Sequence, residues 1–382
     1  MRSTAVKSPN RLLSSLTDMI GSRMAHQFYE HVLDSRPDRS ERHTAESPRG
    51  GLADKASGVE PLARDQVVRL AEGVTLLHVG MAARYVIEKM SRIPCEVELA
   101  SEFRYRDPIL EESGLVIIIS QSGETADSLA ALRLCKERGV RTLAVVNVVG
   151  SSIAREADSV IYTWAGPEIA VATTKAYSTQ MAVLDLLAVY LAAQRNTISA
   201  EEANRLTAAI AALPARVEQI LSSREQIQYY ASQYFNHDSV FFIGRNLDYA
   251  LGMEGSLKLK EISYIHSEAY ASGELKHGTI SLIEEGTPVI ALSTYGPLFD
   301  KAMSNVVEVQ ARGARVLALT TETHREAMLA RTDRVLTVPE VEPMLLPQLG
   351  VAPLQLLAYY IALERGCDID KPRNLAKSVT VE

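Results

Sequence analysis

The stretch "GLVIIISQSGETADSLAALRLCKERGVRTLAVVN" (114–147) decides the fold class. A short apolar run is followed by a polar turn that contains glycine, then by a segment with helical spacing of apolar residues, and then by a second apolar run. Short apolar strands that alternate with helices are typical of βαβ units, in which helices cover both faces of a parallel sheet. We therefore predict an α/β fold around this unit.

The same alternation continues on both sides of this unit. The apolar runs 74–80 ("VTLLHVG"), 95–100 ("CEVELA") and 158–165 ("DSVIYTWA") predict three further strands. Residues 173–196 ("TTKAYSTQMAVLDLLAVYLAAQRN") predict a long, strongly apolar helix. A doubly wound sheet, with its ligand site at the carboxyl ends of the strands, follows from this pattern.

The whole pattern then recurs in the second half of the chain. "SVFFIGRN" (239–246) matches "TLLHVG", "TPVIALSTYG" (287–296) matches "GLVIIISQSG", and "LFDKAMSNVVEVQARGARVLALTT" (298–321) matches the helix and strand after the first turn. Matched order and spacing indicate two copies of one flavodoxin-like domain, joined by helical residues 195–235. The predicted domains are 74–215 and 216–367, followed by a polar tail, 368–382.

Composition limits the remaining possibilities. The 382 residues suffice for two domains, and a net charge of −7 argues against a nucleic-acid partner. Three widely spaced cysteines offer neither a metal site nor a disulfide pattern, so we predict no metal and no cofactor. No signal core and no uninterrupted apolar stretch of membrane-spanning length is visible, which predicts a cytoplasmic protein without a membrane partner. Before residue 74 we predict one amphipathic helix (11–33) and a polar linker (34–62).

The turn "SQSGETADS" (120–128) has two interpretations. Ser120, Ser122 and Thr125 could donate to a phosphate at the start of the following helix, where backbone amides are free. Alternatively, Ser122 could be the N-cap of that helix, with Glu124 and Asp127 in its first turns. The position at the end of a predicted central strand makes the two interpretations about equally good.

Two other stretches contain ionisable candidates. Lys258 and Glu261 are three residues apart on a predicted helix, so they form either a surface ion pair or a proton-transferring pair at a cleft. His277 lies in a loop, and Lys377 lies in the polar tail. By spacing alone, each of these two residues is an ordinary solvated side chain.

These residues lie in stretches that resemble the isomerase half of glucosamine-6-phosphate synthase, also called glutamine–fructose-6-phosphate aminotransferase, which is built from tandem sugar-isomerase (SIS) domains. The similar stretches are "SEFRYRDP" (101–108), "SQSGETADSLAALR" (120–133), "GSSIARE" (150–156), "AGPEIAVATTKAYSTQ" (165–180), "LKLKEISYIHSEAYASGELKHG" (257–278), "APLQLLAYYIA" (352–362) and "DKPRNLAKSVTVE" (370–382).

The resemblance implies an open-chain fructose 6-phosphate ligand and a role for each candidate. Lys377 is implied to form a Schiff base with the ketose, Glu261 to move a proton between C1 and C2, and Lys258 to assist it. His277 is implied to open the sugar ring at the neighbouring subunit's site, hence in a homodimer. The residues implied to bind the substrate are Ser120, Gln121, Ser122, Thr125, Val171, Thr173 and Ala376.

Two departures from this family are expected. No N-terminal cysteine is available as a glutaminase nucleophile, since the first cysteine is Cys95, so ammonia would come from a separate glutaminase or from solution. The family's first strand ends in a Cys-Gly-Thr-Ser loop that binds phosphate. With a strand at 74–80, the interval to Ser120 is shorter than the matching interval in the second copy, which predicts a shortened loop and weaker phosphate binding.

Three functions therefore remain possible. The first is an enzyme that isomerises or aminates fructose 6-phosphate in amino-sugar synthesis. The second is a sugar-phosphate-binding protein or partner subunit without catalysis, and the third is a sugar-phosphate deaminase.

Overall fold

The computed structural model describes residues 68–72 and 74–377, so the predicted helix at 11–33 and the linker at 34–62 lie outside the described residues. The first half of the chain forms a parallel five-stranded sheet in the order β2-β1-β3-β4-β5. Its strands are β1 (Val68–Glu72), β2 (Cys95–Leu99), β3 (Leu115–Ser120), β4 (Arg141–Val146) and β5 (Ser159–Tyr162).

Helices cover both faces of this sheet. The helices of this half are α3 (Val74–Ser91), α4 (Ala100–Phe103), α5 (Ala126–Glu137), α6 (Ser152–Glu156) and α7 (Lys175–Gln194). Even-numbered β3 residues such as Val116 and Ile118 belong to the core on the side of α5 and α6, whereas Ile117 and Ile119 belong to the core on the side of α3 and α7.

The second half repeats this architecture after two connecting helices, α8 (Ala200–Ala211) and α9 (Leu213–Leu221). Its parallel sheet has the order β10-β9-β8-β6-β7, which is the same order as in the first sheet when strands are counted within each half. The strands are β6 (Ser239–Gly244), β7 (His266–Ala271), β8 (Pro288–Ser293), β9 (Arg315–Thr321) and β10 (Val335–Val338). This strand order, 2-1-3-4-5, is flavodoxin-like and confirms the predicted tandem repeat.

The remaining elements flank the second sheet. Its α-helices are α10 (Arg224–Tyr234), α11 (Leu247–Ser263), α12 (Phe299–Gln310), α13 (Arg325–Leu329) and α14 (Leu346–Glu364). Short 3₁₀ turns are η2 (Ser272–His277), η3 (Thr279–Leu282), η4 (Gly296–Leu298), η5 (Glu322–His324) and η6 (Pro343–Leu345).

The prediction of a first strand at 74–80 is wrong. The strand is β1, residues 68–72, and residues 74–80 form the start of α3. The buried residues of this helix recur with helical spacing rather than in alternation: Val79, Ala82, Ala83, Val86 and Ile87. With β1 in place, the interval from Glu72 to Ser120 is within one residue of that from Gly244 to Ser293. The short interval from which a shortened loop was predicted is therefore absent once the strand is placed correctly.

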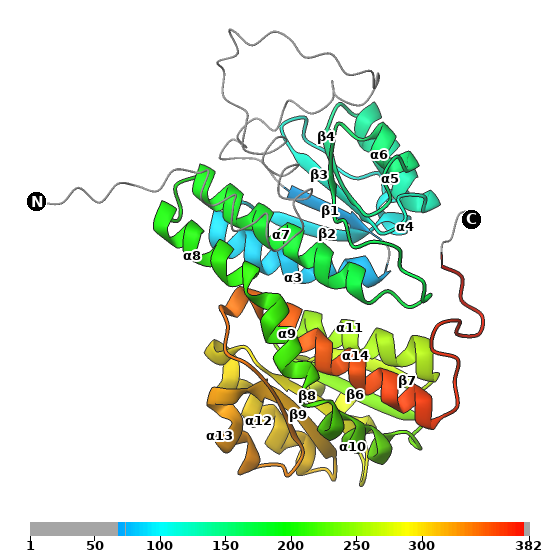
Figure 1. Cartoon of the computed structure of the whole chain (residues 1–382), viewed down its shortest axis with the longest axis vertical. Coiled ribbons are helices and arrows are strands. Elements are labelled where there is room, and N and C mark those ends of the chain that lie inside the picture. The colour runs from blue at the N-terminus through cyan, green and yellow to red at the C-terminus, as the bar shows by residue number, and fades with distance from the viewer. Residues whose placement is uncertain (1–67, 73, 378–382) are drawn as a thin grey trace, which may run out of the picture.

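The two halves meet through a layer of helices. Figure 1 shows α3 and α7 of the first half facing α11 and α14 of the second, between the two sheets. Apolar side chains from both halves form one continuous core through this layer. Two helical stretches, Lys175–Gln194 and Pro343–Glu364, are by length and composition apolar enough to cross a membrane, but 78% of the most apolar 18-residue window of each is buried inside the protein. Burial in this layer accounts for their apolar composition.

Candidate functional site

The turn after β3 presents polar groups at the carboxyl edge of the first sheet. The buried hydroxyl of Ser120 accepts a hydrogen bond from the Gly123 amide at 2.9 Å, and the Ser122 hydroxyl accepts one from the Glu124 amide at 3.2 Å. Gly123 has φ +69°, and a Cβ there would lie 2.1 Å from the Ser151 hydroxyl oxygen. The turn therefore requires glycine both for its backbone conformation and for its close approach to Ser151.

The alternative in which Ser122 caps the next helix is wrong. Helix α5 begins at Ala126, and its N-cap is Thr125, which makes no side-chain capping bond. The glycine turn delays the start of the helix by three residues, although Asp127 does lie in the first turn as predicted. The Thr125 hydroxyl is thus not used to cap the helix, which favours the interpretation that this turn binds an anion.

In the second half, the matching turn after β8 is occupied by a side chain from the same half. Asp248, on the first turn of α11, accepts hydrogen bonds from the amides of Thr294 and Tyr295 at 3.0 Å each and from the Thr294 hydroxyl. Burial raises the pKa of Asp248 to about 6, against the lowering effect of these hydrogen bonds. In the described part of the chain, no carboxylate takes the equivalent place at Gln121 and Ser122. The first turn is therefore the one left open to an anionic ligand.

Asn147, just after β4, connects this turn to the loop before α7. Its amide nitrogen donates to the Gln121 carbonyl at 3.3 Å, and its side-chain oxygen accepts from the Ala165 amide at 2.8 Å. Its side-chain nitrogen donates to the Gly166 carbonyl at 2.9 Å. The loop that contains Val171 and Thr173 is thereby anchored to the polar turn.

The C-terminal tail lies on this same loop. The Val171 amide donates to the Asp370 carbonyl at 2.9 Å, and the Lys377 ammonium donates to the Ala170 carbonyl at 2.6 Å. Glu168, whose side chain is 3% exposed, lies 3.6 Å from the Lys377 nitrogen and accepts from the Thr174 amide at 2.7 Å. Lys377 is therefore held beside a carboxylate, although the sequence alone gave it no more weight than any solvated lysine.

The tail also contacts the end of α11. The Arg373 amide donates to the Tyr264 hydroxyl at 2.8 Å, and the Arg373 guanidinium lies 4.2 Å from the centre of the Tyr264 ring. Tyr264 is the C-cap of α11 and has a left-handed backbone conformation. Because Glu261 lies three residues before this cap, the tail connects the end of α11 to the loop that contains Val171.

Helix α11 buries the predicted pair of ionisable residues. The Lys258 ammonium donates to Glu261 at 2.6 Å and lies 3.6 Å from Glu254, with 2% of its side chain exposed. Burial by itself lowers the pKa of Lys258, but the negative charges of Glu254 and Glu261 outweigh burial and hold that pKa above its usual value. The pair is thus a buried cluster with a protonated lysine, and the surface ion pair is excluded.

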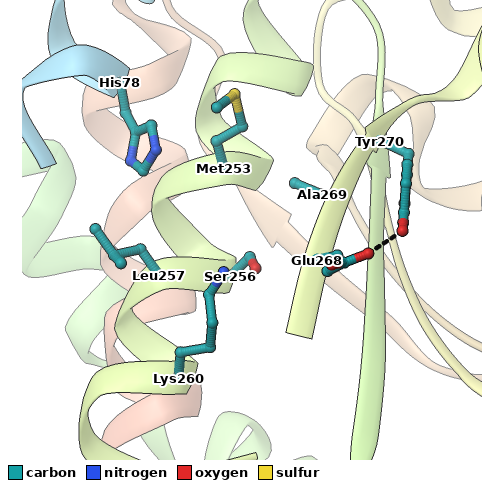
Figure 2. A pocket seen from close by; sticks show the side chains of 8 residues that line it. All are labelled: His78, Met253, Ser256, Leu257, Lys260, Glu268, Ala269 and Tyr270. Atoms are coloured by element: carbon teal, nitrogen blue, oxygen red, sulfur yellow. Dashed lines mark hydrogen bonds between the residues drawn. The ribbon is translucent and has the colours of Figure 1, made fainter. Parts of the chain in front are cut away.

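A pocket of about 330 Å³ lies beside α11. It contains none of the predicted site residues; among its lining residues are Met253 and Leu257 of α11, Glu268 and Tyr270 of β7, and His78 of α3. Figure 2 shows His78 beside the α11 residues, with the hydrogen-bonded Glu268 and Tyr270 across the pocket.

His277 is not brought to the other candidates. It is exposed at the end of η2, and within residues 74–377 no contact joins it to Lys258, Glu261 or Lys377. Ala376 is exposed in the tail, and Gln121, Ser122, Thr125, Val171 and Thr173 are partly exposed.

Sequence reasoning missed four residues that organise the site: Asn147, Glu168, Glu254 and His78. Asn147 had a usable signal, since a polar residue directly after a buried strand marks the ligand edge of a doubly wound sheet. Glu254 also had one, because it lies one helical turn before Lys258. Nothing in the local pattern singles out Glu168 or His78.

Known proteins share these features. A family model described as SIS domain matches residues 63–190 and 233–365. The glutamine–fructose-6-phosphate aminotransferase (isomerizing) of Clostridium acetobutylicum is 57% identical over 318 residues, which is 83% of this chain and 52% of that protein. The chain thus spans about half the length of the curated relatives it matches.

Solved structures agree with this similarity. The C-terminal domain of glucosamine-fructose-6-phosphate aminotransferase from Francisella tularensis has a TM-score of 0.80 and 32% identity, and the match covers 97% of this chain and 100% of that one. Glucosamine-6-phosphate deaminase from Thermotoga maritima, with a TM-score of 0.67 and 24% identity over 97% of this chain and 99% of that one, shares the fold. The chain therefore belongs to the SIS-domain family, as a tandem pair of the kind found in the C-terminal part of the glutamine–fructose-6-phosphate aminotransferases.

Proposed function

We propose that this chain binds fructose 6-phosphate and converts it to glucosamine 6-phosphate with ammonia, in amino-sugar synthesis. Three links carry the proposal. Asn147 joins the polar turn to the loop before α7, and the tail with Lys377 lies on that loop. Arg373 of the tail contacts Tyr264 at the end of α11, the helix that holds Lys258 and Glu261. In addition, the relatives with the highest identity quoted above are aminotransferases that act on fructose 6-phosphate by name.

The polar turn suits the phosphate. Gln121, Ser122 and Thr125 are partly exposed at the start of α5, where amides and hydroxyls can donate to an anion. The absence of lysine and arginine from residues 120–125 is compatible with this role, because a helix start supplies its own partial positive charge. Val171, Thr173 and Ala376 lie on the anchored loop and the tail, beside the proposed sugar position.

The reaction balances with these side chains. Lys377 attacks C2 of the open-chain ketose, and an imine forms with loss of water. Ammonia then replaces Lys377 at C2, which releases the lysine as a free amine. Glu261 removes a proton from C1 and delivers it to C2 through the enolamine, while Lys258 stabilises the developing negative charge. The sum is fructose 6-phosphate plus ammonia giving glucosamine 6-phosphate plus water.

Incubation with fructose 6-phosphate and ammonium chloride tests the proposal, with glucosamine 6-phosphate as the measured product. Lys377→Ala and Glu261→Gln should abolish product formation, whereas Lys371→Ala, an exposed lysine in the same tail, should leave it unchanged. An arm with glutamine in place of ammonium should give no product, as expected if the chain has no glutaminase activity of its own and ammonia comes from solution or a separate glutaminase.

The other two functions are outcomes of the same experiment. Saturable binding of fructose 6-phosphate with no product in any arm would indicate a sugar-phosphate-binding protein without catalysis. Ammonia release from glucosamine 6-phosphate that exceeds the forward rate would indicate a deaminase.

We also propose a cytoplasmic homodimer. His277 is exposed at the end of η2 and makes no contact with the proposed catalytic residues, so it is available to open the sugar ring in a neighbouring subunit. Mixing inactive His277→Ala and Lys377→Ala chains should restore product formation if the two residues act across subunits.

A further inference from the structure

His78 forms a buried link between the two halves of the protein. It projects from α3 of the first half, and its Nδ1 lies 2.8 Å from Oε2 of Glu254 on α11 of the second half. The side chains of His78 and Glu254 are 5% and 0% exposed. The two residues are 176 positions apart, so the bond exists only when the halves are docked.

We assign the donor role in this bond to His78. The Lys258 ammonium lies 3.6 Å from the other oxygen of Glu254, as expected for a cation facing a carboxylate. A carboxylate can only accept hydrogen bonds, so Nδ1 of His78 is the donor in this arrangement.

His78 supplies the hydrogen bond that Glu254 makes within the described residues. Its other oxygen, Oε1, is 3.6 Å from the Lys258 ammonium and has no hydrogen-bond partner among the described residues. A fully buried carboxylate is costly unless it is hydrogen-bonded and paired with a cation. Without His78, Glu254 would be held only by an attraction to Lys258 that is longer than a hydrogen bond.

The other groups around Glu254 do not replace His78. From α7, the buried Tyr177 has a hydroxyl without a partner in the described chain, and burial, together with the negative charge of Glu254, raises the pKa of Tyr177, so it stays neutral. Helix α14 presents the apolar side chain of Leu354 against Gly255, next to Glu254. Helix α11 itself contributes Lys258 and, beyond it, Glu261.

We propose that His78 is a positioning residue for the reaction: by donating to Glu254 across the boundary between the halves, it fixes the carboxylate that faces the Lys258 ammonium, which in turn donates to Glu261. The inference rests on the proposed function of Lys258 and Glu261. His78 also lines the pocket beside α11, and that pocket contains none of the residues proposed to bind the sugar. It therefore acts through Glu254, and its loss should lower kcat with little change in KM.

His78→Asn and His78→Leu form a matched pair of variants. Asparagine keeps a donor near the position of Nδ1, whereas leucine fills a similar volume without any donor. We expect His78→Leu to lower kcat for glucosamine 6-phosphate formation by roughly tenfold to a hundredfold, because displacement of a catalytic group by about 1 Å can cost 10²-fold. Its KM for fructose 6-phosphate should change less than about threefold, and His78→Asn should recover most of the lost rate.

The pH profile separates this role from a purely structural one. If Glu254 is no longer fixed beside Lys258, its negative charge raises the pKa of Lys258 less, so the basic limb of the kcat profile should move to lower pH in His78→Leu and return in His78→Asn. Equal kcat values and superimposable profiles for wild type and His78→Leu, at equal folded fractions, would overturn the proposal. So would a loss in kcat that His78→Asn does not relieve.

A second measurement keeps this inference distinct from the proposed function. Nitrogen-15 spectra of the histidine rings should show a proton on Nδ1 of His78, and this signal should shift in Glu254→Gln. If wild type forms no product, the proposed function fails; the spectra still report whether the bond across the two halves exists. An Nδ1 without a proton overturns the positioning role regardless of activity.

Discussion

Replacement of Gly123 by alanine should damage the polar turn in two separable ways. The new Cβ would lie 2.1 Å from the hydroxyl oxygen and 2.6 Å from the Cβ of Ser151, and the backbone has φ +69°. The left-handed conformation costs a residue with a Cβ about 1–2 kcal/mol. Overpacking against the neighbouring helix start adds about 1–3 kcal/mol. Gly123→Ala should therefore lower the free energy of unfolding by about 2–5 kcal/mol.

The double variant Gly123→Ala/Ser151→Gly distinguishes the two costs. Removal of the Ser151 side chain relieves the overlap and leaves the backbone strain, so about 1–3 kcal/mol should return relative to the single variant. Urea denaturation of wild type, both single variants and the double variant measures this coupling. Titration calorimetry should show at least about tenfold weaker fructose 6-phosphate binding for Gly123→Ala, the effect of losing one hydrogen bond to a charged group. Two results would refute this reasoning: a midpoint of urea denaturation for Gly123→Ala equal to that of wild type, or no recovery of stability in the double variant.

Three further predictions concern the charged and tail residues. Lys258→Met should abolish turnover and, by leaving two carboxylates without their cation, should cost about 3–5 kcal/mol of stability in urea denaturation at pH 7. Burial raises the pKa of Asp248 in the folded protein to about 6, above its usual value of 3.8. Between these two pH values the folded state holds a proton on Asp248 that the unfolded state has lost, so the stability that Asp248 contributes at low pH disappears as pH rises through this window. The difference in unfolding free energy between wild type and Asp248→Asn should fall by about 3 kcal/mol over that window and stay flat above it. Tyr264→Phe removes the hydrogen bond from Arg373, so proteolysis of the tail should accelerate and turnover should fall, while global unfolding changes by only about 1 kcal/mol.

The repeated architecture was predictable because it is encoded in local periodicity. Each central strand of the second half is a short apolar run with a glycine or polar turn after it, and these runs predicted the correct elements. The first strand was misplaced because "VRLAE" contains two charged residues, whereas the following "VTLLHVG" is apolar. Short apolar runs do not distinguish a strand from a buried helix, and only the spacing of Val79 onward shows that this segment is helical.

The site was predictable only in part, for a related reason. Lys258 and Glu261 were recognisable because both lie on one face of one helix. By contrast, the partner of Glu254 comes from the other half of the chain, and the partner of Lys377 is a backbone carbonyl at Ala170. Such contacts depend on how the halves and the tail dock, and no local pattern encodes docking.

The two halves share one fold but differ at the turn that would bind an anion, and this difference explains why the proposed site is composite. In the second half, Asp248 satisfies the amides of Thr294 and Tyr295, so an anionic ligand would have to displace a carboxylate that is already hydrogen-bonded there. In the first half, the matching turn has no such occupant among the described residues. This difference favours the first half as the place of the proposed phosphate site. The groups proposed to transfer the proton lie on α11, whose first turn supplies Asp248 and whose later turns carry Lys258 and Glu261. In the proposed site, one helix therefore occupies the anion position of its own sheet with Asp248 and places its ionisable groups toward the ligand of the other half.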